Sequence, residues 1–410
     1  ENNENEKKIP TRLESYSKLQ KVINSVETIY VDDIKLHEII DKAIKGLLNE
    51  LDAHSTLMDK KYYKEFKVQM NGKFGGLGIV VGMRNGALTV ISPIDDTPAK
   101  KAGIKAGDIL LKIDNKSTLK MTLNEAVSIM RGKAGSPIDI VVVRKNETKP
   151  IKFHIVRDII SIKSVNAKIF DNILYLRISS FDNNVETQLK KFIKKYQKNT
   201  KGIILDLRNN PGGSLSQAIK TVDLFVDSGI IVSQKGRDSS QDRSYEASSN
   251  NTITKVPMVV LVNEGSASAS EIVSGALQDL KRAVIVGKKT FGKGSVQIVL
   301  PLDNQQTEAI KLTIAKYYLP SGRTIQAKGV TPDIESFEGK AVKQEENDYL
   351  IKEKDLKKHL EIELEKINPK QKKEDKKNKI KKDQLTRDDI YEDNQLKTAT
   401  DVLKALILMK

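Results

Sequence analysis

Between residues 159 and 333, largely apolar runs alternate with helical patterns, and this alternation limits the fold more than any other feature. Residues 202–207 and 258–262 lack the period of two that marks a strand with one face in water. Such runs indicate strands buried on both faces, as in a parallel sheet covered by helices. Helical patterns at 185–198 and 214–225 fit between such strands. We therefore expect an α/β domain here.

The flanking segments have different patterns. Residues 12–70 show helical spacing and little glycine, whereas from Asn71 to about Arg157 short β-type runs alternate with glycine turns. The region beyond 340 is highly charged, and only 393–408 regains an amphipathic pattern that suits docking on the core or on another subunit. We expect four regions: a helical one at 1–70, a β-domain at 71–157, the α/β core at 158–340 and a charged helical one at 341–410.

Composition excludes several classes of function. The net charge of +16 invites a nucleic-acid interpretation, but the lysine-rich stretch 351–382 also carries acids, and the chain has no Trp for base stacking. The absence of Cys excludes disulfides and thiolate catalysis. No cluster of His and carboxylates has metal-ligand spacing, and no apolar run approaches the ~18–20 residues of a membrane span. We expect no nucleic acid, metal or cofactor.

The first candidate site is the turn after 202–207, with the sequence Asn-Asn-Pro-Gly-Gly. Gly212 and Gly213 leave backbone N–H groups free at the start of a helix, which suits an anion or oxyanion. An ordinary strand-to-helix turn explains the same residues.

The second candidate is the Gly/Ser/Ala turn after 258–262, from which the hydroxyl of Ser268 can protrude. A helix N-cap at Ser268, in a capping box with Glu271, explains the same pattern. The third is Lys293 between Gly292 and Gly294, whose spacing does not match a phosphate-binding loop.

The four histidines lie outside the α/β part of the chain. His37, His54 and His359 fall in the helical flanks, and His154 lies in a β-type run. Because a Ser–His pair needs hydrogen-bond distance, we do not expect a histidine base for Ser268.

Together these segments resemble the C-terminal processing peptidases, also called tail-specific proteases, from about residue 31 to 334. The small β-domain resembles a PDZ domain, and Leu51-Asp-Ala-His-Ser55 looks like the motif that precedes it, although Ala53 stands where proline is usual. The resemblance rests on Gly265-Ser-Ala-Ser-Ala-Ser-Glu-Ile272, Phe291-Gly-Lys-Gly-Ser-Val-Gln297, Asp206-Leu-Arg-Asn-Asn-Pro-Gly-Gly213, Pro320-Ser-Gly-Arg-Thr-Ile-Gln326 and Gly329-Val-Thr-Pro-Asp-Ile334.

The resemblance implies a role for each matching residue. Ser268 is the nucleophile, Lys293 the general base and Gln297 the residue that orients the lysine. Ser266 and Ser270 are the competing nucleophiles.

The same resemblance implies an oxyanion hole from the N–H of Ala269 and that of Gly212 or Gly213. The base must be a neutral lysine, which requires lowering its pKa from about 10.4 by about 3 units, or about 4 kcal/mol. Burial can supply a shift of that size.

The PDZ-like domain is expected to select substrates. Leu77, Gly78 and Ile79 resemble its carboxylate-binding loop, beside a strand that can pair with a substrate tail. Arg131 is a candidate link between this domain and the active site, although such an arginine is often only a surface residue.

The resemblance thus implies an α/β multidomain protein, with a crotonase-like protease core, an inserted PDZ domain and helical N- and C-terminal regions. It implies an endopeptidase that acts on proteins with apolar C-termini, in the periplasm or anchored at the outer face of the inner membrane, its signal or anchor removed. A homodimer and an activating adaptor are further expectations. The alternatives are a non-catalytic PDZ scaffold and a crotonase-like enzyme that acts on coenzyme A thioesters.

Overall fold

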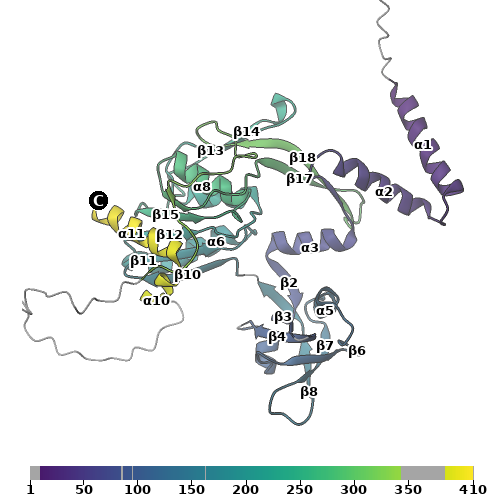
Figure 1. The fold of residues 1–410 in the computed structure, drawn as a ribbon, viewed down its shortest axis with the longest axis horizontal. Helices are drawn as coiled ribbons and strands as arrows, with labels where there is room; N and C mark the ends of the chain where they lie inside the picture. The colour runs from purple at the N-terminus through teal and green to yellow at the C-terminus, as the bar shows by residue number, and fades with distance from the viewer. Residues whose placement is uncertain (1–9, 85, 95, 162, 343–383, 410) are drawn as a thin grey trace, which may run out of the picture. The chain divides into compact units, whose positions relative to one another are not determined.

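The computed structural model describes residues 10–84, 86–94, 96–161, 163–342 and 384–409, and Figure 1 shows their helices and strands. The chain divides into two compact units. The first unit comprises Glu1–Val68, Gln234–Arg243 and Ser295–Tyr317, and the second comprises Gln69–Ser233, Ser244–Gly294 and Tyr318–Lys410.

The core of the second unit is a six-stranded sheet in which five neighbouring strands are parallel. Its central strands β12 and β15 are buried at every residue, as their continuous apolar sequences predict. The sixth strand, β10, pairs antiparallel with β11. In spatial order the strands are β10 (Val165–Phe170), β11 (Ile173–Ile178), β12 (Gly202–Asp206), β15 (Met258–Val262), β16 (Val284–Gly287) and β19 (Ile334–Glu335).

Helices follow the strands in the alternation that the sequence predicts. Helix α6 (Val185–Tyr196), which runs into η1 (Gln197–Asn199), packs against α7 (Leu215–Asp223), and α7 packs against α8 (Ala269–Asp279). After α7 come the strands β13 (Ile230–Lys235) and β14 (Arg243–Glu246), with η2 (Ser239–Gln241) between them. The segment Gln234–Arg243 belongs to the first unit.

The C-terminal helix α11 (Asn394–Leu408) packs on the parallel sheet, after the short helix α10 (Arg387–Tyr391). Figure 1 shows α11 in yellow across strands β12 and β15. Buried Leu396, Ala399 and Leu403 join the sheet residues of one core cluster. The amphipathic pattern at 393–408 was compatible with docking on the core or on another subunit. In the structure, α11 docks on the core.

The PDZ-like domain lies within the second unit and has its own core. Its strands form a six-stranded antiparallel sheet around a buried cluster that includes Leu88, Val90 and Ile140. A two-stranded ribbon of β2 (Lys73–Gly76) and β9 (Asp158–Ser161) frames it. The remaining elements are β3 (Ile79–Arg84), β4 (Ala87–Pro93), α4 (Pro98–Ala102), β5 (Ile109–Ile113), β6 (Lys116–Ser117), α5 (Leu123–Met130), β7 (Pro137–Val143) and β8 (Ile151–Val156).

The first unit combines the N-terminal helices with a long hairpin. Its strand β1 (Thr56–Met58) pairs with β18 (Ala309–Tyr318), which pairs with β17 (Ser295–Pro301). Because of this pairing, residues 295–317 group with the N-terminal region, whereas the sequence placed them in the protease core. The helices are α1 (Arg12–Ile29), α2 (Leu36–Asn49) and α3 (Lys60–Asn71).

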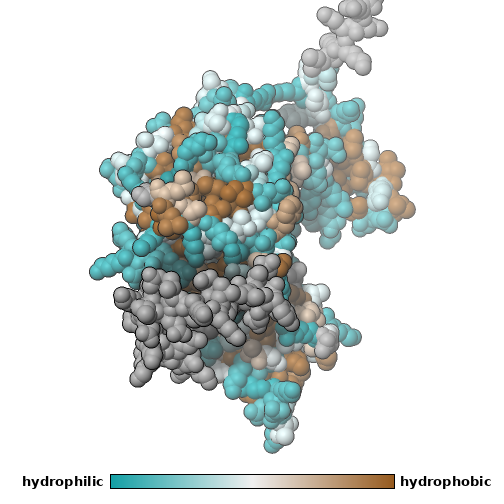
Figure 2. Space-filling view, turned by 60° about the vertical axis from the view of Figure 1, so that its left-hand side comes forward, coloured by the Kyte–Doolittle hydropathy of each residue, from teal (hydrophilic) through white to brown (hydrophobic). Residues whose placement is uncertain are grey.

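Helix α1 buries none of its residues. Leu13, Tyr16, Leu19 and Val22 are all more than half exposed, and Figure 2 shows brown, apolar side chains on the surface of α1 and α2. Within the described part of the chain, no helix is both long and apolar enough to cross a membrane.

Candidate active site

Ser268 lies where the buried strand β15 passes through a tight turn into α8. Its backbone has φ +53° and ψ −110°, a conformation that L-residues avoid because the side chain crowds the backbone. Non-glycine residues with such angles cluster at functional sites, and a serine on a strained strand-to-helix turn holds its hydroxyl out of the fold. The geometry of Ser268 therefore suits a nucleophile.

The two competing serines are used structurally. Ser266 is fully buried and donates to the carbonyl of Leu207 at 2.8 Å. Ser270 is also fully buried and donates to the carbonyl of Asn210 at 2.9 Å. Ser268, by contrast, is partly exposed. A reacting hydroxyl must reach its substrate, so exposure favours Ser268 over the other two.

Glu271 joins the Ser268 turn to the lysine loop. Its carboxylate is fully buried, and its Oε2 accepts the backbone N–H groups of both Ser268 (2.8 Å) and Lys293 (2.9 Å). Its Oε1 accepts the N–H of Gly292 at 2.6 Å and the hydroxyl of Thr290 at 2.5 Å. The backbone of Ser268 and that of Lys293 thus meet on one carboxylate oxygen.

The capping interpretation of Glu271 is therefore only part of its role. Ser268 is the N-cap of α8 and donates its N–H to Glu271, but the same carboxylate also holds a loop about 20 residues further along. Sequence reasoning missed this second role, because nothing in the spacing of Thr290 or Gly292 points to a distant carboxylate.

Burial raises the pKa of Glu271 above its usual value, and the Thr290 hydroxyl and three backbone N–H groups oppose that rise. Four donors surround this carboxylate, so its ionised form has the hydrogen bonds that a buried charge needs.

The glycines beside Lys293 allow close backbone approach. A Cβ on Gly294 would lie 2.5 Å from the backbone nitrogen of Gln326, and one on Gly292 would lie 3.3 Å from that of Gly329. Both glycines therefore let the loop run directly against the 325–329 turn, which keeps Lys293 partly buried.

The Pro-Gly-Gly turn packs against Ser268. A Cβ on Gly212 would lie 2.9 Å from the Cβ of Ser268, and only glycine adopts its φ of +100° freely. The N–H of Gly212 donates to the Asn210 side chain at 2.9 Å. Within the described ranges, the N–H groups of Gly213 and Ala269 donate to no protein acceptor. Gly213 is thus the better oxyanion candidate.

Gln297 lies on β17 of the first unit, whereas Ser268 and Lys293 belong to the second. Its amide donates to the hydroxyls of Ser295 (2.9 Å) and Thr313 (3.2 Å). The Thr313 hydroxyl in turn donates to the carboxylate of Asp52 at 3.1 Å. The pre-PDZ motif at 51–55 therefore fixes the side chain of Gln297, a link that its sequence does not indicate.

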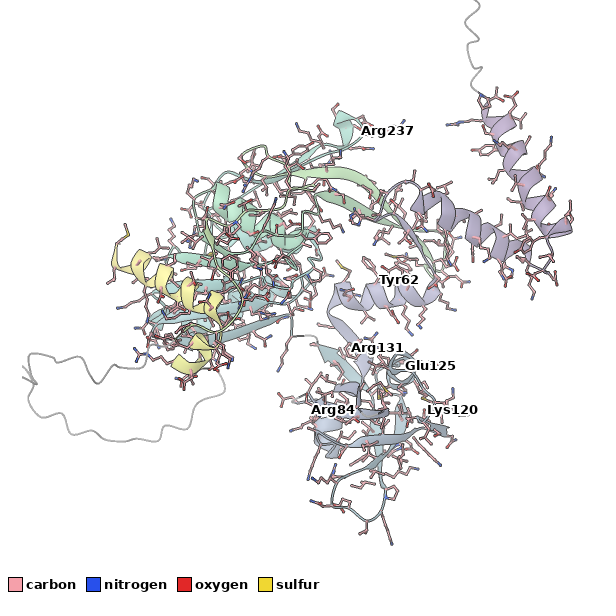
Figure 3. All side chains as sticks on the ribbon, viewed as in Figure 1. Tyr62, Arg84, Lys120, Glu125, Arg131 and Arg237 are labelled. Atoms are coloured by element: carbon pink, nitrogen blue, oxygen red, sulfur yellow. The ribbon has the colours of Figure 1, made fainter. Side chains whose placement is uncertain are left out.

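In the PDZ-like domain, four residues that the sequence singled out line one cavity of about 100 Å³. Leu77 and Gly78 lie just before β3, which begins at Ile79, and Arg131, labelled in Figure 3, follows α5. The Arg131 guanidinium lies 4.9 Å from the ring centre of Phe74, and its Nε is buried without a hydrogen-bond partner. The cavity therefore combines an apolar lining with an unsatisfied cationic donor.

Within the described residues, no group of three or more His, Asp and Glu could hold a metal ion. His154 is exposed on β8, where it contacts Asp139 at 2.7 Å. His359 lies outside the described residues.

Comparisons with known proteins find relatives over most of this chain. Residues 172–336 match the model of peptidase family S41, and residues 89–144 match that of the PDZ domain. The carboxy-terminal-processing protease of Bartonella bacilliformis is 44% identical over 83% of this chain and 79% of its own. CtpA of Bacillus subtilis, a carboxy-terminal processing protease, is 36% identical over 81% and 71%. A solved photosystem II D1 C-terminal processing protease is 27% identical, with TM-score 0.46, over 78% of this chain and 86% of that one.

A mixed α/β core with a PDZ domain and a strained serine turn is the architecture of a PDZ-containing serine protease. The chain belongs to peptidase family S41, among the carboxy-terminal processing proteases.

Proposed function

We propose that this protease cleaves peptide bonds with Ser268 as nucleophile and Lys293 as general base. The observation that carries the proposal is that the strained Ser268 turn and the Lys293 loop share the carboxylate of Glu271. Lys293 in its neutral form takes the proton of the Ser268 hydroxyl as the oxygen attacks the substrate carbonyl. The N–H groups of Ala269 and Gly213 then stabilise the oxyanion.

The acyl-enzyme forms when the peptide nitrogen leaves with the proton that Lys293 carries, and water hydrolyses it by the same route. From the family resemblance alone, we assign Gln297 the role of orienting the lysine. We assign the α/β core that carries these groups to the crotonase-like fold.

The PDZ domain recognises the substrate's free C-terminus and gates access to Ser268. The carboxylate would bind the N–H groups of Leu77 to Ile79, with Arg131 as a cationic partner. A 150 Å³ apolar cavity accommodates benzene, so a cavity of about 100 Å³ suits a smaller aliphatic side chain. Substrates should therefore end in residues such as Ala or Val.

The proposal also covers the assembly of the protein and its location in the cell. The exposed apolar side chains of α1 suit a homodimer in which two N-terminal regions cover one another. An activating adaptor, and a place in the periplasm or at the outer face of the inner membrane, follow from the family resemblance alone.

The test compares cleavage of an unfolded protein ending in Val-Ala-Ala by the unmodified chain and by Ser268→Ala and Lys293→Ala. Both variants should lose at least about a thousandfold in kcat. The matched control is Lys289→Ala, which removes an exposed lysine of the same segment and should cleave normally. Unchanged cleavage by Ser268→Ala or Lys293→Ala would refute the mechanism. Binding without cleavage by the unmodified chain would favour a PDZ scaffold.

A further inference from the structure

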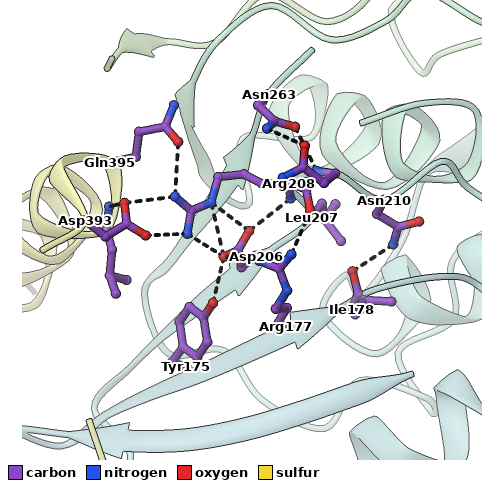
Figure 4. A network of polar contacts seen from close by, with 12 residues as sticks. Tyr175, Arg177, Ile178, Asp206, Leu207, Arg208, Asn210, Asn263, Asp393 and Gln395 are labelled. Carbon is purple, nitrogen blue, oxygen red and sulfur yellow. Dashed lines mark hydrogen bonds and ion pairs between the residues drawn. The ribbon is translucent and has the colours of Figure 1, made fainter. Parts of the chain in front are cut away.

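Arg208 lies one residue before the 209–213 turn and binds two carboxylates from distant parts of the chain. Its Nε and Nη2 donate to Asp206 at 3.0 and 2.7 Å. Its Nη1 and Nη2 donate to Asp393 at 2.9 and 2.8 Å. Figure 4 shows the guanidinium between the two acids, and only 11% of its side chain is exposed. Two bidentate pairs fix both the position and the plane of a guanidinium.

The second carboxylate belongs to the C-terminal helix, and it too is fixed. Asp393 is the N-cap of α11 and accepts the N–H of Leu396 at 3.1 Å. Gln395, which is 1% exposed, accepts from Arg208 Nη1 at 3.1 Å and donates to the carbonyl of Ser336 at 2.9 Å. The start of α11 therefore provides a rigid acceptor for Arg208.

The connection from Arg208 to the active site is short. Asn209 has a strained φ of +55°, and its N–H donates to the side chain of Asn263 at 2.8 Å. Asn263 returns a bond to Asn209 at 2.9 Å and also accepts the N–H of Gly265, in the turn that carries Ser268. The position of Arg208 thus affects both the 209–213 turn and the turn that carries Ser268.

We infer that Asp393 and Gln395 of the C-terminal helix are positioning residues, which hold the oxyanion turn in its reactive geometry through Arg208. The inference relies on the oxyanion role proposed above for Gly213, five residues after Arg208. Without the Asp393 carboxylate, Arg208 keeps one bond to Gln395 and its pair with Asp206, which ends the strand that leads into the turn and moves with it. A small displacement of an oxyanion donor lowers kcat, because the donor must meet charge that develops only in the transition state.

The variant that tests this is Asp393→Asn, which keeps the size and capping ability of the side chain but cannot accept both guanidinium bonds. Peptide cleavage should show kcat lower by about tenfold with KM within about twofold of the unmodified value. The matched control is Asp401→Asn on the same helix, which removes an exposed carboxylate paired with Lys397 and should leave kcat unchanged.

Thermal unfolding separates positioning from loss of fold. Both asparagine variants should be fully folded at the assay temperature, and Asp393→Glu, which restores a carboxylate, should recover part of the lost kcat. An unchanged kcat for Asp393→Asn would overturn the inference, as would a loss that vanishes once rates are normalised to folded protein. Ser268→Ala, run in parallel, keeps the outcomes distinct: if it cleaves normally, the proposed catalytic mechanism fails; if it is inert while Asp393→Asn keeps its kcat, only the positioning role fails.

Discussion

At the residue scale, Ser268 owes its exposure to a backbone conformation that the surrounding structure must enforce. Strain of this kind amounts to about 1–3 kcal/mol per residue, so neighbouring bonds have to hold it in place. Glu271 supplies one of these bonds through the N–H of Ser268, and Gly212 packs against the serine from the other side.

Glu271→Gln should reduce both stability and activity. The amide keeps one acceptor oxygen and turns an NH₂ group toward N–H donors that now lack a partner. Each unsatisfied buried donor costs about 1–3 kcal/mol, so thermal unfolding should shift to a clearly lower temperature. The kcat should fall at least about a hundredfold, because the Ser268 and Lys293 segments lose their common anchor. The control Glu264→Gln removes an exposed carboxylate of the same turn and should leave both quantities near normal.

Gly212→Ala should abolish most activity even where the protein still folds. The new methyl would meet the carbonyl of Ala267 at 2.8 Å and the Cβ of Ser268 at 2.9 Å, so Ser268 must move. The control Gly322→Ala has a comparable φ of +81° but opens onto empty space. Equal losses of kcat/KM in the two variants would mean that backbone strain, rather than the contact with Ser268, is responsible.

At the scale of elements, strand β12 and helix α11 are joined by the Asp206–Arg208–Asp393 cluster. Burial alone would raise the pKa of Asp206, but the hydrogen bonds and charge of Arg208 outweigh it and hold the pKa below its usual value. A carboxyl group whose pKa is lower in the folded state stabilises the fold above its unfolded pKa, and that stabilisation is lost as the pH falls through the folded one.

Asp206→Asn should therefore destabilise the protein by about 3 kcal/mol at pH 7, because Arg208 loses a buried partner. The difference from the unmodified protein should shrink as the pH falls below about 3.8, the usual value for aspartate. Urea unfolding at pH 7, 5 and 3 measures this difference. A gap that stays constant across the series would show that the Asp206 charge does not stabilise the fold.

At the scale of the whole molecule, the proposal places recognition in the PDZ domain and cleavage in the α/β core, so a substrate's tail should affect KM without entering the chemistry. A peptide with an amidated C-terminus should show KM raised about tenfold, since it loses a charge-assisted hydrogen bond. Arg131→Gln should remove most of that preference for the free acid. The control Arg84→Gln, exposed on β3, should retain it. Equal cleavage of free and amidated tails by the unmodified chain would contradict the PDZ proposal.

The sequence by itself determined much of the local structure, because local structure depends on periodicity and turn chemistry. The continuous apolar runs predicted β12 and β15, and the change of pattern at Asn71 falls where helix α3 ends, just before β2. The small-residue turn at Ser268 and the Gly-Lys-Gly loop were both visible as candidate sites. Neither could be distinguished from an ordinary turn without the family resemblance.

Only the tertiary structure decided how these segments meet. The sequence pattern indicates that Glu271 is a capping residue, but in the structure its carboxylate joins the backbone of Ser268 to that of Lys293. The amphipathic tail gives no sign that Asp393 binds Arg208. In the sequence, Gly212 and Gly213 are equivalent candidates for the oxyanion hole. In the structure, the N–H of Gly212 donates to the Asn210 side chain, which leaves Gly213 as the better candidate. Each of these contacts joins residues through the folded backbone, whose path no local pattern specifies.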